Sequence, residues 1–228
     1  MLALVGSGEY LPPMEPVDRV LLERLPAPPR VVCLPTAAGT EGPERIGYWT
    51  QLGEEHFKKL GAPVQSLPVI DRASANDPGL ARAIAAANFV YLSGGKPGYL
   101  FQTLEGSLAW ESILAVIKNG GLLAGCSAGA MIMGEAFFGF SSRNRQGGFR
   151  LLPGATIIPH YDEIPDWVVA PVRDWITHGL TLIGIEGNTA LLANNHRMEV
   201  LGAGGVTIWN KADKNRYTQG PVPDWNAH

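Results

Sequence analysis

The chain has 228 residues, of which 46% are hydrophobic and 17% charged, and its formal net charge is −3. This length is enough to bury a sizeable core, and the near-neutral charge balance offers no basic surface for nucleic acid. No apolar run reaches the length of a membrane span, and the N-terminus lacks the basic region of a signal peptide.

The cysteine and histidine content indicates in which cellular compartment the protein works and whether it binds a metal. Two cysteines are too few for a disulfide framework and indicate a reducing cytoplasm. The five histidines stand far apart, so no zinc-ligand cluster is expected. We therefore expect a cytoplasmic protein with no metal or cofactor, no nucleic-acid partner and no membrane partner. The sequence leaves the oligomeric state open, with a homodimer as one alternative.

Apolar runs alternate with helical patterns through the first part of the chain. Asp77 is a good N-cap and Pro78 a good first residue for one of these helices. Strands separated by helices imply a parallel sheet that is covered on both faces. The predicted strands are 2–6, 30–35, 64–70, 89–95 and 121–125, and the predicted helices are 17–25, 43–61, 77–88, 107–120 and one that starts at 128.

The last third has a different pattern. Strands 155–160 and 181–186 flank a helix around 166–178, and three further apolar runs follow at short spacing: 189–194, 197–203 and 206–210. That spacing favours antiparallel hairpins at one edge of the sheet. The predicted architecture is a single domain over residues 1–228: a three-layer α/β sandwich with a mostly parallel sheet and antiparallel C-terminal strands.

The stretch "GCSAGA" (125–130) carries the clearest chemical signal. Gly125, Ser127 and Gly129 fit the nucleophile motif G-x-S-x-G, and they lie where a buried strand turns into a helix. In that turn the helix N-terminus offers free N–H groups to a developing negative charge. Cys126 is intrinsically the more reactive side chain, but it precedes the nucleophile position and should point into the fold. A turn of small residues without chemistry is the alternative.

A nucleophilic serine needs a general base and an oxyanion hole. His160 ends a predicted strand, and in open α/β sheets catalysis collects at the carboxyl ends of strands. His56 lies on a polar helix face, where we expect it to be solvated. Gly94 and Gly95 end another strand, so a backbone N–H there and the N–H of Ala128 are the candidate oxyanion donors.

These segments resemble the peptidase S51 family, which contains the aspartyl dipeptidases (peptidase E) and the cyanophycinases. The likeness runs nearly end to end, and it implies a class I glutamine amidotransferase-like fold. "GCSAGA" matches the family motif G-x-S-A-G-A with Ser127 as nucleophile, and "YLSGG" (91–95) resembles the strand whose oxyanion donor falls on Gly95. "LLPGATIIPHYDE" (151–163) resembles the segment that carries the catalytic histidine, here His160.

The orienting carboxylate is less well marked. Family members take this acid from the segment shortly after the serine, but "SSRNRQ" (141–146) contains none. Asp162 stands two residues after His160, the H-x-E spacing of glutamine amidotransferases. Glu186, in "LIGIEGNTALL" (182–192), falls on the acid of a similar family segment, and Glu135 is the third candidate. Asp162 is the first choice among them.

The resemblance implies a serine hydrolase that cleaves an amide bond of a small peptide, such as an aspartyl or isoaspartyl peptide. Peptidase E members carry Asn after the oxyanion glycines, whereas this chain has Lys96. The candidate substrate-binding residues are Gly94, Lys96 and Arg173. Arg173 is included because its guanidinium could bind a substrate carboxylate through two hydrogen bonds. The alternatives are an amidase or esterase of other specificity on this fold, and a non-catalytic binding module with an incomplete triad.

Overall fold

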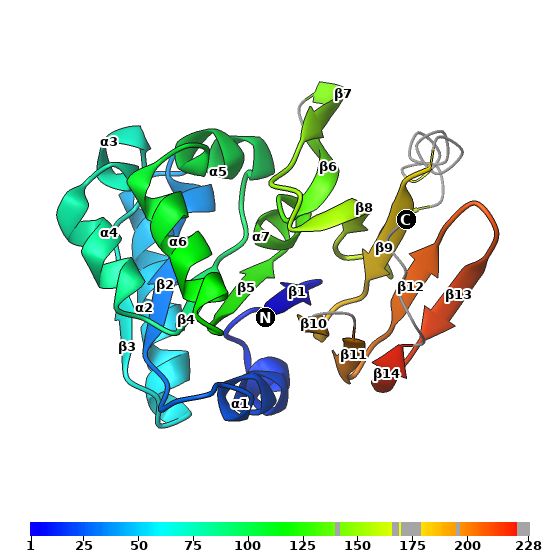
Figure 1. Ribbon diagram of the computed structural model, residues 1–228, viewed down its shortest axis with the longest axis horizontal. Coiled ribbons are helices and arrows are strands. Elements are labelled where there is room, and N and C mark those ends of the chain that lie inside the picture. Colours follow the sequence, from blue (N-terminus) through cyan, green and yellow to red (C-terminus); the bar gives the residue numbers. More distant parts are fainter. Residues whose placement is uncertain (140–141, 166–168, 170–178, 195–196, 223–228) are drawn as a thin grey trace.

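The computed structural model describes residues 1–139, 142–165, 169, 179–194 and 197–222, and it contains two β-sheets with helices packed around them (Figure 1). The larger sheet has eight strands in the order β14-β11-β10-β1-β5-β4-β2-β3. Its five central and far strands run parallel: β1 (Leu2–Val5), β2 (Val31–Leu34), β3 (Val64–Ser66), β4 (Phe89–Leu92) and β5 (Leu122–Cys126).

Three C-terminal strands extend the larger sheet beside β1 and pair antiparallel. They are β10 (Thr189–Asn194), β11 (Arg197–Gly202) and β14 (Gly220–Val222). A mostly parallel sheet with an antiparallel C-terminal edge was predicted from the sequence, and the prediction of an α/β fold of this kind is confirmed.

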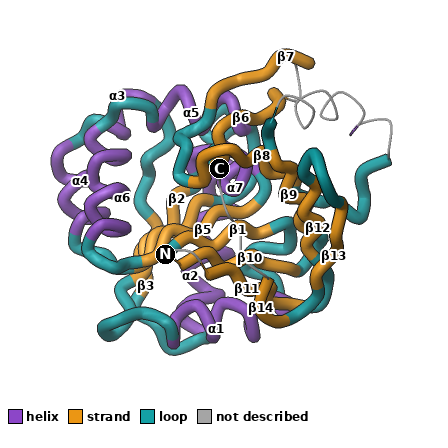
Figure 2. The backbone as a smooth tube through the Cα atoms, turned by 45° about the vertical axis from the view of Figure 1, so that its right-hand side comes forward, coloured by secondary structure: helices purple, strands orange, loops and turns teal. Residues whose placement is uncertain are grey.

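Helices cover both faces of the larger sheet (Figure 2). Alternate residues of a strand point to opposite faces, so Phe89 and Tyr91 of β4 pack in one core with α1 and α2, while Val90 and Leu92 pack in the other with α4, α5 and α6. The helices are α1 (Glu15–Glu23), α2 (Pro43–Lys59), α3 (Arg72–Ala75), α4 (Pro78–Ala85), α5 (Pro97–Leu104), α6 (Leu108–Lys118) and α7 (Ala128–Met131), with 3₁₀ turns η1 (Pro12–Met14) and η2 (Thr36–Ala38).

Two local predictions can be checked on these helices. Asp77 caps α4 as expected, because its side chain accepts the N–H groups of Gly79 and Leu80. The prediction for His56 was wrong: only 4% of this residue is exposed, and its Nε2 lies 2.8 Å from Oδ2 of the equally buried Asp18. The pairing with a carboxylate on α1 turns His56 inward, which the helical pattern of α2 alone did not reveal.

The smaller sheet, of six strands in the order β13-β12-β9-β8-β6-β7, was not predicted. Its central strands β6, β8 and β9 run parallel, and α7 packs against both β6 and β8. Its members are β6 (Gly134–Gly139), β7 (Ser142–Gly147), β8 (Leu152–Ile158), β9 (Thr181–Ile185), β12 (Val206–Trp209) and β13 (Lys214–Tyr217).

The predicted hairpin between the runs 197–203 and 206–210 is therefore wrong. β12 pairs with β9 and β13 in the smaller sheet, while β11 stays in the larger one. The chain changes sheet at a turn that begins with Gly202, whose φ is +109° and where a Cβ would lie 2.3 Å from the Asn188 carbonyl oxygen. The helix predicted around 166–178 lies outside the described residues apart from residue 169.

Candidate active site

Ser127 stands at a sharp turn between β5 and α7. Its φ and ψ are 49° and −107°, a conformation that is strained for any residue with a side chain and that is found at nucleophile elbows. The two glycines of the motif permit the turn. A Cβ on Gly125 would lie 2.5 Å from the carbonyl carbon of Gly129, and one on Gly129 would lie 2.7 Å from the Leu92 carbonyl oxygen. The strand and helix can approach this closely only without those side chains.

Cys126 points into the fold, as the sequence interpretation required. Its side chain is fully buried, and Sγ lies 2.8 Å from Oε2 of Glu9. Burial, reinforced by the negative charge of Glu9, raises the pKa of this thiol well above its ordinary value. The thiol therefore keeps its proton at neutral pH, which makes it a poor nucleophile.

The Gly94-Gly95 turn after β4 lies beside the elbow. A Cβ built on Gly94 would stand 3.5 Å from the Cβ of Ser127, so the two residues are neighbours in space. Gly95 has a φ of +143°, and a side chain there would meet the Ala37 backbone at 2.7 Å. The N–H of Gly94 is taken by Glu9, whereas that of Gly95 donates to no acceptor in the described part of the chain. Gly95 is thus the glycine with a free donor.

His160 follows β8 of the smaller sheet, at the carboxyl end of that strand. Its φ is +52°, its side chain is 38% exposed, and its Nδ1 lies 3.5 Å from Oε2 of Glu163. The next residue anchors it: the Tyr161 N–H donates to the Ile185 carbonyl at 3.0 Å, and the Tyr161 ring covers Gly184. The structure thus ties the His160 segment to the end of β9. The pairing of Ser127 with His160 stays a prediction from the sequence.

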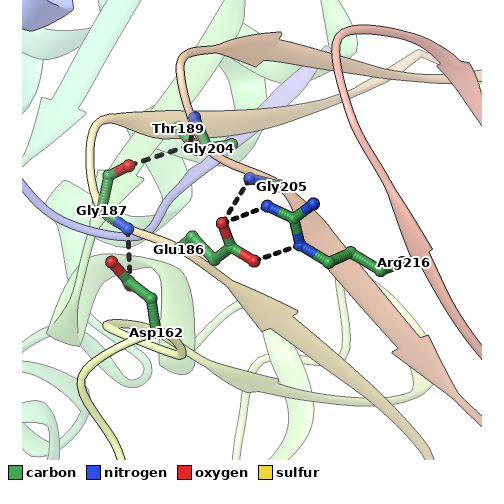
Figure 3. A network of polar contacts seen from close by, with 7 residues as sticks. All are labelled: Asp162, Glu186, Gly187, Thr189, Gly204, Gly205 and Arg216. Atoms are coloured by element: carbon green, nitrogen blue, oxygen red, sulfur yellow. Dashed lines mark hydrogen bonds and ion pairs between the residues drawn. The ribbon is translucent and has the colours of Figure 1, made fainter.

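Two of the three predicted carboxylates lie at the end of β9 or beside it (Figure 3). Asp162 accepts the Gly187 N–H at 2.8 Å. Glu186 forms a two-pronged ion pair with Arg216 of β13, at 2.6 Å and 2.7 Å, and also accepts the Gly205 N–H at 2.8 Å. The hydrogen bonds from Arg216 hold the pKa of Glu186 below its ordinary value. Glu186 is therefore a carboxylate that stays charged.

Glu135, the third predicted carboxylate, belongs to β6. It accepts the Gly154 N–H at 2.9 Å and lies 3.8 Å from the Arg150 guanidinium. These contacts join β6 to the beginning of β8, the end of that strand opposite to His160.

Of the candidate substrate-binding residues, Gly94 and Lys96 lie in the described part of the chain and Arg173 does not. Lys96, the N-cap residue of α5, directs its Nζ to the Thr40 hydroxyl at 2.9 Å, and its backbone N–H donates to the Ala37 carbonyl. Its exposed ammonium therefore stands directly after the oxyanion glycines. Arg173 lies outside the described residues. No cluster of three or more His, Cys, Asp or Glu side chains that could hold a metal ion occurs in the described ranges.

Sequence reasoning missed three residues of this region: Glu9, Glu163 and Arg216. Glu9 follows β1 just as Gly94 follows β4 and His160 follows β8, so the rule that strand ends carry chemistry could have found it. Arg216 carries no such signal, because its pairing with Glu186 depends on β13 lying in the smaller sheet.

The two sheets, the strained serine and the glycine turn beside it define an α/β protein in which a turn of the nucleophile-elbow kind follows a strand of a parallel sheet. Comparison with known proteins makes this specific. The profile of Peptidase family S51 matches residues 2–201, and the chain belongs to that family.

Individual relatives agree with the family. A crystal structure of a peptidase from an acI-B1 Actinobacterium is 34% identical, with a TM-score of 0.88 over 97% of this chain and 95% of that one. A protein from Listeria monocytogenes EGD-e, proposed to be a peptidase E, shares the fold with a TM-score of 0.65 at 20% identity, over 89% of this chain and 98% of that one. An uncharacterized peptidase of Listeria innocua, Lin0382, is 27% identical over 78% of this chain and 86% of its own length.

None of the helices in the described part of the chain is long and apolar enough to cross a membrane.

Proposed function

We propose that the protein is a serine peptidase that cleaves an amide bond in a small peptide. The observation that carries this proposal is the conformation of Ser127: a serine with a φ of 49° at a strand-to-helix turn, beside a glycine turn with a free N–H. Such strain persists only where the surrounding packing enforces it, and it collects at active sites.

In the proposed mechanism the Ser127 hydroxyl attacks the substrate carbonyl carbon. His160 takes the hydroxyl proton as general base and then delivers it to the leaving amine as general acid. The negative charge that forms on the carbonyl oxygen is stabilised by the N–H groups of Gly95 and Ala128. A water molecule then attacks the acyl carbon and gives a proton to His160, the bond between that carbon and the Ser127 oxygen breaks, and His160 returns the proton to Ser127 as the acid product leaves.

For the carboxylate that orients His160, the strand pairing supports Glu186 ahead of Asp162 and Glu135. Tyr161, in the segment that follows β8, donates its N–H to the carbonyl of Ile185 at the end of β9, and His160 and Glu186 are the residues next to that bonded pair. Glu186 is also held charged by Arg216, which an orienting acid requires. Asp162 binds the Gly187 N–H, a contact that fits a role in shaping the loop.

The proposed substrates are small peptides with an acidic group, such as aspartyl or isoaspartyl peptides. The exposed ammonium of Lys96 follows the oxyanion turn and could attract a carboxylate there. The proposed location is the cytoplasm, which suits two cysteines that are both free and buried.

A fluorophosphonate probe tests the proposal, because it labels only an activated serine. We expect the wild-type protein to gain one probe by intact mass, and Ser127→Ala to gain none. A panel of dipeptides that varies the N-terminal residue and includes β-linked aspartyl peptides then identifies the substrate. A wild-type protein that is neither labelled nor active on any dipeptide would reject the function.

A further inference from the structure

Glu9 is a buried carboxylate in the loop that follows β1. Only 6% of the residue is exposed, yet both of its oxygens are occupied. Oε1 accepts the Gly94 N–H at 2.8 Å, and Oε2 lies 2.8 Å from Sγ of Cys126. A buried carboxylate is costly unless hydrogen bonds satisfy it. The two bonds explain how the residue is tolerated, but not why a carboxylate stands here.

The two partners of Glu9 belong to the two halves of the candidate catalytic centre. Gly94 opens the turn that carries the Gly95 N–H, and Cys126 directly precedes Ser127. Gly94 follows β4 and Cys126 ends β5; these two strands are neighbours in the larger sheet, and β5 lies between β4 and β1 (Figure 1). One side chain therefore connects the oxyanion turn to the nucleophile elbow.

The geometry at Gly94 shows how tight this connection is. A Cβ on Gly94 would stand 2.8 Å from Oε1 of Glu9 and 3.5 Å from the Cβ of Ser127. By taking the Gly94 N–H, Glu9 fixes the orientation of the peptide unit before Gly94. The following N–H, that of Gly95, is then the one that stays free. The loop that carries Glu9 is itself held, since the Tyr10 hydroxyl lies 3.3 Å from that of Ser93.

We propose that Glu9 is a positioning residue that holds the Gly94-Gly95 turn against the Ser127 elbow, so that the Gly95 N–H is aimed at the oxyanion. The inference rests on the proposed serine peptidase function. Glu9 makes no contact with the reacting atoms in this mechanism. Loss of Glu9 should lower the rate of the chemical step and leave the affinity for substrate nearly unchanged. The reason is that the oxyanion forms only on the way to the transition state.

The experiment compares Glu9→Ala, Glu9→Asp and Glu9→Gln in the full chain. Glutamine keeps a side-chain oxygen for the Gly94 N–H, so Glu9→Gln should stay within about threefold of wild-type kcat. Alanine removes the acceptor, so kcat should fall by about 10- to 100-fold with KM changed less than about threefold. The rate of fluorophosphonate labelling should fall in parallel.

Two controls separate positioning from general stability. Asp18→Asn alters another buried carboxylate, whose partner is His56, and should lower neither kcat nor labelling. If Glu9→Ala does not fold, Glu9→Asp carries the test, because its shorter side chain withdraws the acceptor from Gly94. A fall in its kcat of about tenfold or more supports the proposal.

The proposal is overturned if a folded Glu9→Ala or Glu9→Asp keeps kcat within about threefold of wild type, or if KM alone rises. It is also overturned if Glu9→Gln loses as much kcat as Glu9→Ala, since rescue by the retained oxygen would then be absent. Failure of the function itself has a different signature, because the wild-type protein would then be unlabelled and inactive, and the role of Glu9 would fall with it.

Discussion

The two halves of the candidate active site are built in opposite ways. The elbow and the oxyanion turn sit at the end of the larger sheet, where Gly94 and Cys126 are bonded to a buried carboxylate and glycines permit close backbone contact. The base and two of the candidate acids, Asp162 and Glu186, follow the central strands β8 and β9 of the smaller sheet and are called the edge half; the His160 side chain is 38% exposed, Asp162 binds a loop N–H, and Glu186 is paired with Arg216.

This difference indicates that one half of the site holds its groups in fixed positions, while the other half keeps its groups accessible to substrate and water. The backbone N–H groups and the nucleophile must be in place before the substrate arrives, because preorganisation is where oxyanion stabilisation comes from. The histidine must exchange protons with a substrate and with water, which requires exposure. We therefore expect changes at the elbow to affect folding as well as catalysis, and changes at the edge to affect catalysis alone.

The largest effect is expected from Ser127→Gly. Turnover should be lost, while the melting temperature should rise, because removal of the Cβ at a φ of 49° relieves strain. Strain of this kind costs about 1–3 kcal/mol, of which the flexibility of glycine in the unfolded chain cancels about 0.5–1 kcal/mol. Thermal unfolding measures the gain. Ser127→Ala, which keeps the Cβ, is the matched control, and equal melting temperatures of the two variants would mean that the elbow is unstrained.

His160→Ala should come next, with kcat lowered by about 10²- to 10⁴-fold through loss of the general base. Its melting temperature should match the wild type, because the side chain is partly exposed and its contact with Glu163, at 3.5 Å, lies on the surface. Steady-state kinetics measures the fall in kcat, and thermal unfolding measures the melting temperature. Retained activity would show that another group deprotonates Ser127.

Four amide substitutions identify the orienting acid. Glu186→Gln should lower kcat by about 10²-fold or more, because the amide favours the wrong imidazole tautomer. Asp162→Asn should lower kcat by a smaller factor, since the Asp162 carboxylate binds the Gly187 N–H. The kcat values of Glu135→Gln and Glu163→Gln should stay near that of the wild type. The comparison of kcat across the set decides the assignment. If Asp162→Asn shows the largest loss, the first choice from the sequence is the acid.

The elbow half could be predicted from the sequence because its causes are local. The motif at 125–130, the strand before it and the glycine turn at Gly94-Gly95 are each contained in a few consecutive residues. Backbone sterics then dictate the conformation, and the structure has the expected turn at Ser127. The helices with clear caps, such as α4 after Asp77, could be predicted for the same reason.

The edge half could not be predicted fully, because its contacts depend on which strands pair. The run at 206–209 reads as a strand, but only its pairing with β9 brings Arg216 of the next strand to Glu186. His56 is a similar case, since its burial depends on Asp18 of another helix. Periodicity describes one element at a time, and it carries no information about partners distant in the chain.

A smaller effect, on stability, tests the close packing of the elbow half. Gly129→Ala should destabilise the protein by about 1–3 kcal/mol, because the new Cβ would lie 2.7 Å from the Leu92 carbonyl oxygen. Gly47→Ala in α2 is the matched control: nothing lies within 4 Å of its Cβ, so it should stabilise the helix by up to about 1 kcal/mol. Urea unfolding of both variants measures the difference. A Gly129→Ala protein as stable as wild type would show that α7 can move away from Leu92 of β4 at no cost.

The smallest expected effect concerns the buried pair behind the elbow half and depends on pH. Asp18 is fully buried, and only its Oδ2 has a partner among the described residues, namely His56. Burial raises the pKa of this carboxyl above its ordinary value of 3.8, against the opposing effect of His56. The folded chain therefore holds a proton over a pH range in which the unfolded chain has lost it. The resulting stabilisation is present below the unfolded pKa and is lost as the pH rises through the folded pKa.

Asp18→Asn removes this titration while it keeps an oxygen for His56. The free energy of unfolding of the wild type, minus that of the variant, should therefore decrease as the pH is raised from about 4 towards 8. Urea unfolding at a series of pH values measures it, with Asp77→Asn at an exposed cap as the control for general pH effects. If the difference instead grows with pH, the pKa of Asp18 is lowered rather than raised. The attraction of a charged His56 would then outweigh burial, and this region of the core would hold a true ion pair.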